Sequence, residues 1–269
     1  MEPLPEWAPA DTDLKTPSAA RMYDYYLGGA HNFGVDRELA RKVVELYPDA
    51  PALAQANRAF LHRAVRYLVA QGVRQFVDIG SGIPTEGNTH ETAQQAAPDS
   101  RVLYVDHDPV AVAHSERLLG GVPGTAVLRG DLRRPKGILE SRELADLIDL
   151  SQPVGLIMVA VLHFVSEDDD PQGAIDQFRA AVAPGSHLVV SHGSDEVRRA
   201  EAQQAQKLYE SANDKGTFRS RRRVGELLAD WDLVDPGVVW VSEWRPDWPD
   251  EVRADPSTQV MIAAMGRKA

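Results

Sequence analysis

The chain has 269 residues, of which 43% are hydrophobic, and it carries 40 acidic against 29 basic side chains. This length and apolar content are enough to bury one large core, and they predict one domain with an appendage. The net charge of -11 repels polyphosphate, which argues against nucleic acid as a partner. The absence of cysteine excludes disulfides, thiolate metal sites and a cysteine nucleophile.

The sequence carries no pattern typical of export or of a membrane span. No basic and then apolar leader opens it. The longest apolar run, Val154 to Val165, has twelve residues with His163 among them, which is too short to cross a bilayer. We therefore expect a soluble cytoplasmic protein with no membrane partner.

The first 72 residues contain no strand pattern. Residues 1–16 have three prolines, several charges and no hydrophobic period, and they predict a flexible N-terminal arm. Residues 17–72 predict a helical cap with helices over Ala19–Leu27, Val35–Tyr47 and Pro51–Gln71. Residues 73–269 are expected to form the ligand-binding domain.

From residue 73 onward, short apolar strands alternate with helices. This alternation is typical of the α/β class, with a mostly parallel sheet covered on both faces. Two late strand-like runs, Val238–Val241 and Gln259–Ala264, have no room for a helix between them, which favours antiparallel pairing. The other expected strands are Gln75–Ile79, Val102–Val105, Ala126–Leu128, Val154–Ala160 and His187–Val190.

Three of these strands end in residues that suit a nucleoside. The first ends in Asp78 and a Gly-x-Gly turn over residues 80–82, where a ligand can approach the backbone. The second ends in Asp106, at the sequence distance where a carboxylate accepts the hydroxyls of a ribose. The third ends in Gly130-Asp131, whose acid can accept from an exocyclic amine. Together they predict one nucleoside site.

The turn over residues 80–82 departs from the dinucleotide-binding fingerprint. Thr85 occupies the position where a third small residue would let the helix approach a pyrophosphate. The loop then continues with Glu86, whose charge disfavours a diphosphate. A nucleoside without phosphates fits better, and S-adenosylmethionine is the common one.

The strand-end motifs together resemble those of the class I S-adenosylmethionine-dependent methyltransferases. Longer motifs are similar to those of an actinobacterial S-adenosyl methyltransferase family, DUF574: Ser18–Gly29 with Asn32-Phe33, Gly82–Thr85, Tyr104–Pro109 and Pro184–His192. This resemblance spans residues 16–267. It implies a Rossmann-like fold with a seven-stranded, mostly parallel sheet, an antiparallel C-terminal strand and an N-terminal helical cap.

The resemblance also implies which residues hold the cofactor, S-adenosyl-L-methionine. Residues 80–82 would contact its methionine part, and Asp106 its ribose. Asp131 and the Leu132 amide would contact its adenine. Asp78 either contacts the cofactor or only orders the loop. The full predicted set is Tyr23, Tyr26, Gly28, Asp78, Gly80, Ser81, Gly82, Asp106, His107, Gly130, Asp131, Leu132 and Ala160.

The tyrosine-rich segment before the sheet has two open interpretations. Tyr23, Tyr26 and Gly28 could form a lid over the cofactor, with aromatic faces on the adenine or near the sulfonium. Alternatively, the tyrosines only dock an N-terminal helix, because buried tyrosine is commonly a packing residue.

His163 is the candidate catalytic residue. It follows the fourth strand and resembles the Leu-His found there in many small-molecule O-methyltransferases. We expect it to act as a base or as a substrate contact. The alternative is a structural histidine that is hydrogen-bonded to a loop.

Two charged clusters have several interpretations. Three interpretations are open for the basic cluster of Arg219 and residues 221–223. It is the solvated start of a helix, a set of partners for the excess carboxylates, or a site for an anionic substrate. The acidic run Glu167–Asp170 favours helix capping over metal binding. The spacing of five histidines is not that of metal ligands, so no metal is predicted; they are His90, His107, His114, His187 and His192.

These features predict a methyltransferase that uses S-adenosylmethionine and acts on a small-molecule acceptor. The sequence leaves open the acceptor and the oligomeric state. Two rival functions remain: a non-catalytic sensor of S-adenosylmethionine or its demethylated product, and, with less support, a nicotinamide-dependent oxidoreductase. A cavity beside the methyl site and lined by His163 would favour the enzyme over the sensor.

Overall fold

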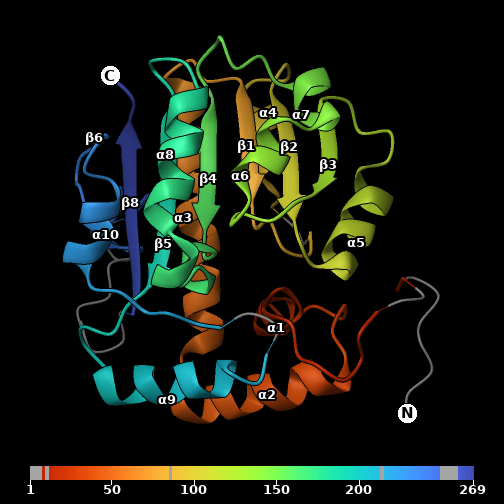
Figure 1. The fold of residues 1–269 in the computed structure, drawn as a ribbon, viewed down its shortest axis with the longest axis vertical. Coiled ribbons are helices and arrows are strands. Elements are labelled where there is room, and N and C mark those ends of the chain that lie inside the picture. Colours follow the sequence, from red (N-terminus) through yellow and green to blue (C-terminus); the bar gives the residue numbers. More distant parts are fainter. Residues whose placement is uncertain (1–7, 10–11, 85–86, 213–214, 249–259) are drawn as a thin grey trace.

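The computed structural model describes residues 8–9, 12–84, 87–212, 215–248 and 260–269. These residues form an eight-stranded sheet in the order β3-β2-β1-β4-β5-β8-β6, with β7 paired to β8 (Figure 1). Strands β1 to β5 pair in parallel, and β8 is antiparallel to its neighbours. The bounds are Gln75–Ile79 (β1), Arg101–Asp106 (β2), Thr125–Arg129 (β3), Gly155–Val159 (β4), His187–Gly193 (β5), Asp232–Leu233 (β6), Val239–Trp240 (β7) and Met261–Arg267 (β8).

Each face of the sheet has its own apolar core, because alternate strand residues point to opposite faces. On one face, Val77 and Leu156 pack with residues of α6, α7, α8 and α10. On the other face, Phe76 and Tyr104 pack with residues of α3 and α4. The helices on and beside the sheet are Ala50–Ala70 (α3), Thr89–Ala96 (α4), Pro109–Leu119 (α5), Pro135–Leu139 (α6), Arg142–Leu147 (α7), Pro171–Ala181 (α8) and Arg221–Leu227 (α10).

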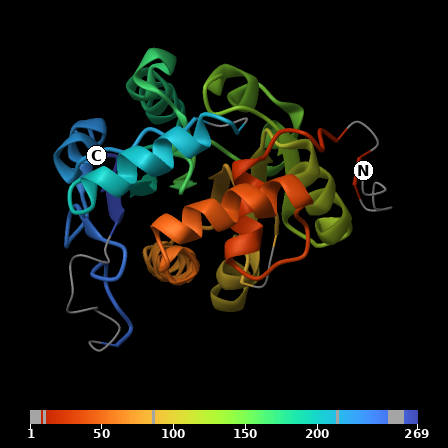
Figure 2. The same ribbon diagram turned by 90° about the horizontal axis from the view of Figure 1, so that it is seen from below.

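Three further helices lie across the carboxyl ends of the parallel strands, as Figures 1 and 2 show from two directions. They are Ala19–Tyr26 (α1), Gly34–Leu46 (α2) and Arg199–Tyr209 (α9). Met22 and Leu39 form a separate small core with Ala212, which follows α9. Segments far apart in the sequence are therefore held together over one edge of the sheet.

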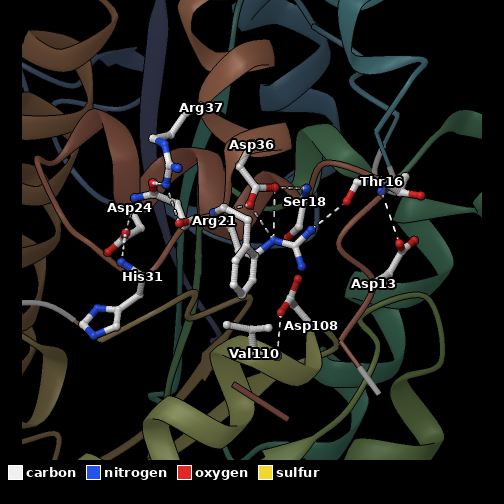
Figure 3. Close-up of polar contacts among 12 residues, drawn as sticks. Asp13, Thr16, Ser18, Arg21, Asp24, His31, Asp36, Arg37, Asp108 and Val110 are labelled. Atoms are coloured by element: carbon white, nitrogen blue, oxygen red, sulfur yellow. Dashed lines mark hydrogen bonds and ion pairs between the residues drawn. The ribbon is translucent and has the colours of Figure 1, made fainter. Parts of the chain in front are cut away.

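A buried ion pair joins α1 to α2 (Figure 3). Arg21 Nε lies 3.0 Å from Asp36 Oδ2, and the two side chains are 2% and 0% exposed. The same carboxylate accepts from Ser18 N at 3.0 Å and from Phe33 N at 2.8 Å. One side chain thus holds the first turns of both helices.

A second buried carboxylate closes the loop between these helices. Asp24 Oδ2 accepts from His31 N and from Asn32 Nδ2, both at 2.8 Å. Arg37 Nη1 then donates to the Asn32 carbonyl at 2.8 Å. The polar residues of this segment fix the position of the tyrosine-bearing helix over the sheet.

The α/β fold class is confirmed, and the predicted strands and first three helices match the observed ones to within a few residues. Among the described residues the sheet has one strand more than the seven implied, because two-residue strands β6 and β7 both pair with β8. The predicted antiparallel pairing near the C-terminus is confirmed by β7 and β8, whereas Gln259 lies outside the described residues. Helix α9 was not predicted.

The division into arm, cap and ligand-binding domain stays a prediction. Residues 1–7 and 10–11 of the expected arm lie outside the described residues, whereas Ala8 and Leu14 pack against the apolar cluster that contains Ile83. Helix α3, expected in the cap, packs its second half against the sheet.

In the part of the chain that the structure describes, no helix combines the length and apolar character that crossing a bilayer requires.

Candidate active site

The turn after β1 lies close against the neighbouring strand ends. Gly80 N and Ser81 N both donate to Val105 O, at 2.8 and 3.1 Å. Gly80 has φ +72°, and a Cβ there would lie 2.3 Å from Cγ2 of Val161. Gly82 has φ +67°, and a Cβ there would meet nothing within 4 Å. The turn therefore requires glycine at its first position and leaves open space beside its last.

Asp106, at the end of β2, connects the three predicted strand ends through its side chain and its backbone carbonyl. Asp106 Oδ2 accepts from Gly82 N at 2.7 Å, and Oδ1 accepts from Asp108 N at 2.9 Å. Gly130 N donates to the Asp106 carbonyl at 3.0 Å, which brings the end of β3 alongside. These bonds hold the Asp106 side chain, 6% exposed, at the edge of the sheet.

Two carboxylates at this edge have raised pKa values. Burial raises the pKa of Asp78 to about 6, although the Thr89 hydroxyl, which donates at 2.6 Å, and the Arg58 charge both lower it. Burial also raises the pKa of Asp106 to about 6, against the opposing charge of His107. Burial removes the hydration that stabilises the ionised form of each carboxylate. A ligand that donates hydrogen bonds to these carboxylates would stabilise that form again.

A cavity of about 220 Å³ begins at these strand ends and extends under helices α1, α2 and α9, which are called the cap helices, or the cap, from here on. Its walls come from the turn after β1, the end of β2, the segment after β4, and helices α1, α2, α3 and α9. The structure therefore brings two predicted strand ends, the tyrosine helix and the candidate catalytic residue to one cavity. The predicted residues that line it are Tyr23, Tyr26, Asp78, Gly80, Ser81, Gly82, Asp106, His107, Ala160 and His163.

Four predicted residues are not among those that line this cavity: Gly28, Gly130, Asp131 and Leu132. Gly28 N donates to a carbonyl of α1 at 3.0 Å and ends that helix. Asp131 accepts from Arg133 Nε at 2.9 Å and from Nη2 at 2.8 Å. The Leu132 side chain lies in the core on one face of the sheet. The adenine contact at this third strand end therefore stays a prediction.

The tyrosines of α1 both dock the cap and cover the cavity. Tyr23 Oη donates to Ala54 O at 3.1 Å and accepts from Asn57 Nδ2 at 3.0 Å. Tyr26 lies in the small core of the cap, with its hydroxyl 3.5 Å from that of Tyr209. Both rings also line the cavity. Contact between these rings and a bound cofactor stays a prediction.

His163 lies in a short 3₁₀ helix, Leu162–Phe164, that follows β4. Its side chain is buried beside the rings of Phe164 and His192, with centroid distances of 4.3 and 5.5 Å. Gly193 N donates to Nδ1 at 3.3 Å. In the neutral ring this bond places the proton on Nε2.

Sequence reasoning missed much of the cavity wall. The wall on α3 consists of residues at the spacing of one helix face: Ala54, Asn57, Arg58 and Leu61. That spacing is visible in the sequence, but it is equally typical of a helix packed on a core. The wall opposite includes Phe164, Tyr209 and Phe218. These three come from separate segments, so no local pattern links them.

The arginine cluster pairs with carboxylates inside the chain. Arg219 is 4% exposed and donates to Glu167 at 2.7 Å and to the carbonyls of Leu162 and Val165 at 3.0 and 2.7 Å. Arg223 pairs with the same glutamate at 2.7 Å. The cluster therefore balances part of the acidic excess, and Arg219 fixes the turn after β4.

The acidic run Glu167–Asp170 caps a helix, as expected. Asp170 Oδ1 accepts from Gly173 N at 2.9 Å at the start of α8. Within the described ranges, no group of three or more His, Cys, Asp or Glu side chains could hold a metal ion.

A family model of the S-adenosyl methyltransferases matches residues 5–269. The chain belongs to this family. A solved protein from Thermobifida fusca is 38% identical, with a TM-score of 0.92 over 98% of this chain and 99% of that one. A DUF574 family protein from Streptomyces avermitilis is 36% identical, with a TM-score of 0.91 over 96% and 99%. The predicted family is thereby confirmed.

More distant structures show the fold alone. A S-adenosylmethionine-dependent methyltransferase from Anabaena variabilis is 10% identical, with a TM-score of 0.54 over 97% of this chain and 100% of that one. A search of the curated proteins found no match. The family confirms S-adenosylmethionine as the cofactor. No comparison supports the nicotinamide-dependent alternative.

The strand-end residues of this S-adenosyl methyltransferase family member fit the cofactor. Ser81 Oγ is buried and has no hydrogen-bond partner in the structure as described, so a ligand can satisfy it. The open space beside Gly82 would admit ligand atoms next to the backbone. The carboxylate of Asp106 lines the same space and suits a ribose.

The cofactor affinity of this family member is expected to fall as the pH is lowered through about 6, since the pKa values of Asp78 and Asp106 lie there. The ionised forms accept hydrogen bonds from an ammonium or a hydroxyl more strongly than the protonated forms. Calorimetry at pH 8 and pH 5.5 should measure weaker binding at the lower pH, and Asp106→Asn should reduce the difference. Equal affinity at both values would contradict this assignment of the carboxylates.

The stability of the free protein should respond to pH in the opposite direction through the same two groups. Their folded pKa values of about 6 exceed the unfolded reference of 3.8. The protonated forms therefore favour folding fully below pH 3.8, and this contribution is lost as the pH rises through 6. In Asp78→Asn, urea unfolding should show less loss of stability between pH 5 and pH 7 than in the unmodified protein. An unchanged pH dependence would contradict the raised pKa of Asp78.

Proposed function

We propose that this chain transfers the methyl group of S-adenosylmethionine to a small molecule bound under the helical cap. One observation carries the proposal: a single cavity joins Gly82 and Asp106 at the strand ends to the space beneath Tyr23 and beside His163. An acceptor in that space would lie next to a cofactor held at the strand ends.

The cofactor would be held by groups that match its polar parts. Asp106 would accept the ribose hydroxyls, and the turn over residues 80–82 would contact the methionine part. Asp78 and Arg58 interact electrostatically at the cavity wall. Their opposite charges would match the ammonium and the carboxylate of that methionine part. When bound, the cofactor supplies an electrophilic methyl group on a sulfonium.

The contribution of the protein to the transfer is chiefly positioning. The acceptor atom must lie in line with the bond that breaks, and holding it there removes much of the barrier. Helices α1, α2 and α9 would cover the reacting atoms on one side. His163 Nε2–H would donate to the acceptor, because the bond from Gly193 N keeps Nδ1 unprotonated. We therefore favour a substrate contact over a general base for His163.

His163→Ala is expected to slow methyl transfer about tenfold and to leave cofactor affinity unchanged, because the loss of one hydrogen bond costs about 1–1.5 kcal/mol. His163→Gln keeps an N–H donor near the position of Nε2 and should retain most of the activity. Transfer of a labelled methyl group and a calorimetric Kd for the cofactor would be measured for both variants. Equal loss in both variants would favour the general base, and no loss in either would remove His163 from the mechanism.

The direct test of the proposed function uses methyl-labelled S-adenosylmethionine and the small-molecule filtrate of a cell extract. The proposal predicts that the cofactor binds in calorimetry and that label moves into the filtrate only when the protein is present. Cofactor binding with no transfer to any fraction would favour the sensor. Binding of NAD without S-adenosylmethionine would contradict both.

A further inference from the structure

The part of the cavity under the cap differs in chemistry from the part at the strand ends. We call it the cap chamber, and it is bounded by α1, α2, the first half of α3, α9 and the segment at Phe218. Figure 1 shows the four helices together below the sheet. Its walls are mainly aromatic and aliphatic, with Tyr26, Val43, Tyr47, Leu53, Tyr209 and Phe218 among them.

Acidic and basic side chains of the cavity wall, as far as the structure describes it, gather at the strand ends. They are Asp78, Asp106, Arg58, His107 and His163, and the charge of Arg58 acts both on Asp78 and on Tyr23 of the chamber wall. The tyrosines of the cap chamber are neutral, because burial raises the pKa of Tyr26 well above its usual value and that of Tyr47 to about 12. A cation in this chamber would lose its hydration without gaining a partner of opposite charge, and an anion would find only Arg58, whose charge already acts on Asp78.

One polar side chain of the cap chamber has an unmet hydrogen-bonding atom. Asn57 is 1% exposed, and its Nδ2 donates to Tyr23 Oη at 3.0 Å. That hydroxyl donates in turn to Ala54 O at 3.1 Å, which fixes the orientation of the amide. Asn57 Oδ1 is buried and has no partner in the described structure. Oδ1 can therefore accept a hydrogen bond from a bound molecule.

We propose that the methyl acceptor is an uncharged aromatic compound with a hydroxyl or amine, which binds in the cap chamber and donates a hydrogen bond to Asn57 Oδ1. This inference rests on the proposed function, because it names the acceptor class of the same site. Aromatic rings pack favourably against aromatic side chains in stacked or edge-to-face arrangements. In the transfer, a lone pair on the acceptor oxygen or nitrogen forms the bond to the methyl carbon. The carbon–sulfur bond breaks with its electrons on sulfur, and the acceptor proton passes to solvent.

Three compounds with one ring system and different charges test the acceptor class. They are 2-naphthol, 2-naphthyl phosphate and 2-naphthylmethylammonium, each titrated by calorimetry into protein saturated with S-adenosylhomocysteine. We expect 2-naphthol to bind at least about tenfold more tightly than either charged compound, because a charged group loses its hydration there and the nearest cation, Arg58, already interacts with Asp78. Equal or tighter binding of a charged compound, or no binding of 2-naphthol, would overturn the proposal.

A substitution that fills the chamber tests the location. Ala205 of α9 lines the cavity and is 1% exposed, so Ala205→Trp should reduce 2-naphthol affinity at least about tenfold while cofactor affinity stays within about twofold. Gln204→Trp places the same side chain at the exposed neighbouring position and should change neither affinity. If the tryptophan variant fails to fold, Ala205→Leu replaces it, and a smaller loss of 2-naphthol affinity is then expected. Unchanged 2-naphthol binding in the Ala205 variants would place the compound elsewhere.

Asn57→Leu tests the polar anchor separately. In the unmodified protein, 2-naphthol should bind more tightly than 2-methoxynaphthalene, which has no polar hydrogen. The variant should lose most of this preference, and a preference that persists would overturn the role of Asn57. Failure of the cofactor to bind would refute the proposed function itself. Normal cofactor binding with the wrong ranking of naphthalene compounds would refute only the acceptor class.

Discussion

Asp36→Ala is expected to lower the free energy of unfolding by about 3–5 kcal/mol, as the removal of one partner of a buried ion pair does. Asp36 is 0% exposed, and its carboxylate accepts from Arg21 Nε, Ser18 N and Phe33 N. Burial raises the pKa of Asp36 in spite of Arg21, so the pair itself is costly to bury. The loss arises because the variant leaves a buried guanidinium and two backbone amides without their acceptor.

Urea unfolding of two variants separates these contributions. A double variant, Arg21→Met with Asp36→Leu, removes both charges and should regain a large part of the stability that Asp36→Ala loses. Because Asp36 holds the first turns of α1 and α2, Asp36→Ala should also loosen the cap and weaken cofactor binding. A loss below about 1 kcal/mol in Asp36→Ala would contradict the buried ion pair.

Asp106→Ala is expected to weaken binding of S-adenosylmethionine by about 1.5–3 kcal/mol, which corresponds to about 10- to 150-fold in Kd. The carboxylate lines the cavity at the end of β2, where its hydrogen bonds to ribose hydroxyls are charge-assisted. The substitution also removes the acceptor of Gly82 N, which helps to hold the glycine turn against the strand. Calorimetric titration with S-adenosylmethionine and S-adenosylhomocysteine should show similar losses for both, since they share the ribose.

Asp232→Ala provides the matched control. Asp232 is exposed and pairs in register with Arg267, which pairs with His187 at the start of β5. It therefore lies at the opposite edge of the sheet from the cavity, and its removal should leave the cofactor Kd unchanged. Equal losses in Asp106→Ala and Asp232→Ala would show that the carboxylate at β2 has no direct contact with the ribose.

The sequence predicts the strand-end part of the site because its signals are local. Gly80 and Gly82 lie in the turn after one apolar strand and Asp106 ends the next, and parallel strands bring such ends to one edge. Asp131 satisfies the same pattern, but in the free protein its carboxylate forms an ion pair with Arg133, two residues later. Competition from a neighbour of opposite charge is not contained in the strand pattern.

The cap chamber could not be predicted in the same way. Its walls combine α3, α9 and the segment at Phe218, and only tertiary packing brings these together. Helix α9 is rich in polar residues, and its contribution through Ala205 and Tyr209 depends on the helices against which it packs. The donor character of His163 likewise depends on Gly193 N, which belongs to a different strand.

A crystal structure of the protein with S-adenosylhomocysteine tests the central claim most directly. The account predicts the ribose hydroxyls within hydrogen-bond distance of the Asp106 carboxylate, the homocysteine beside residues 80–82, and the sulfur facing the cap chamber. A nucleoside bound elsewhere, or an Asp106 carboxylate that does not contact the bound ribose, would contradict it.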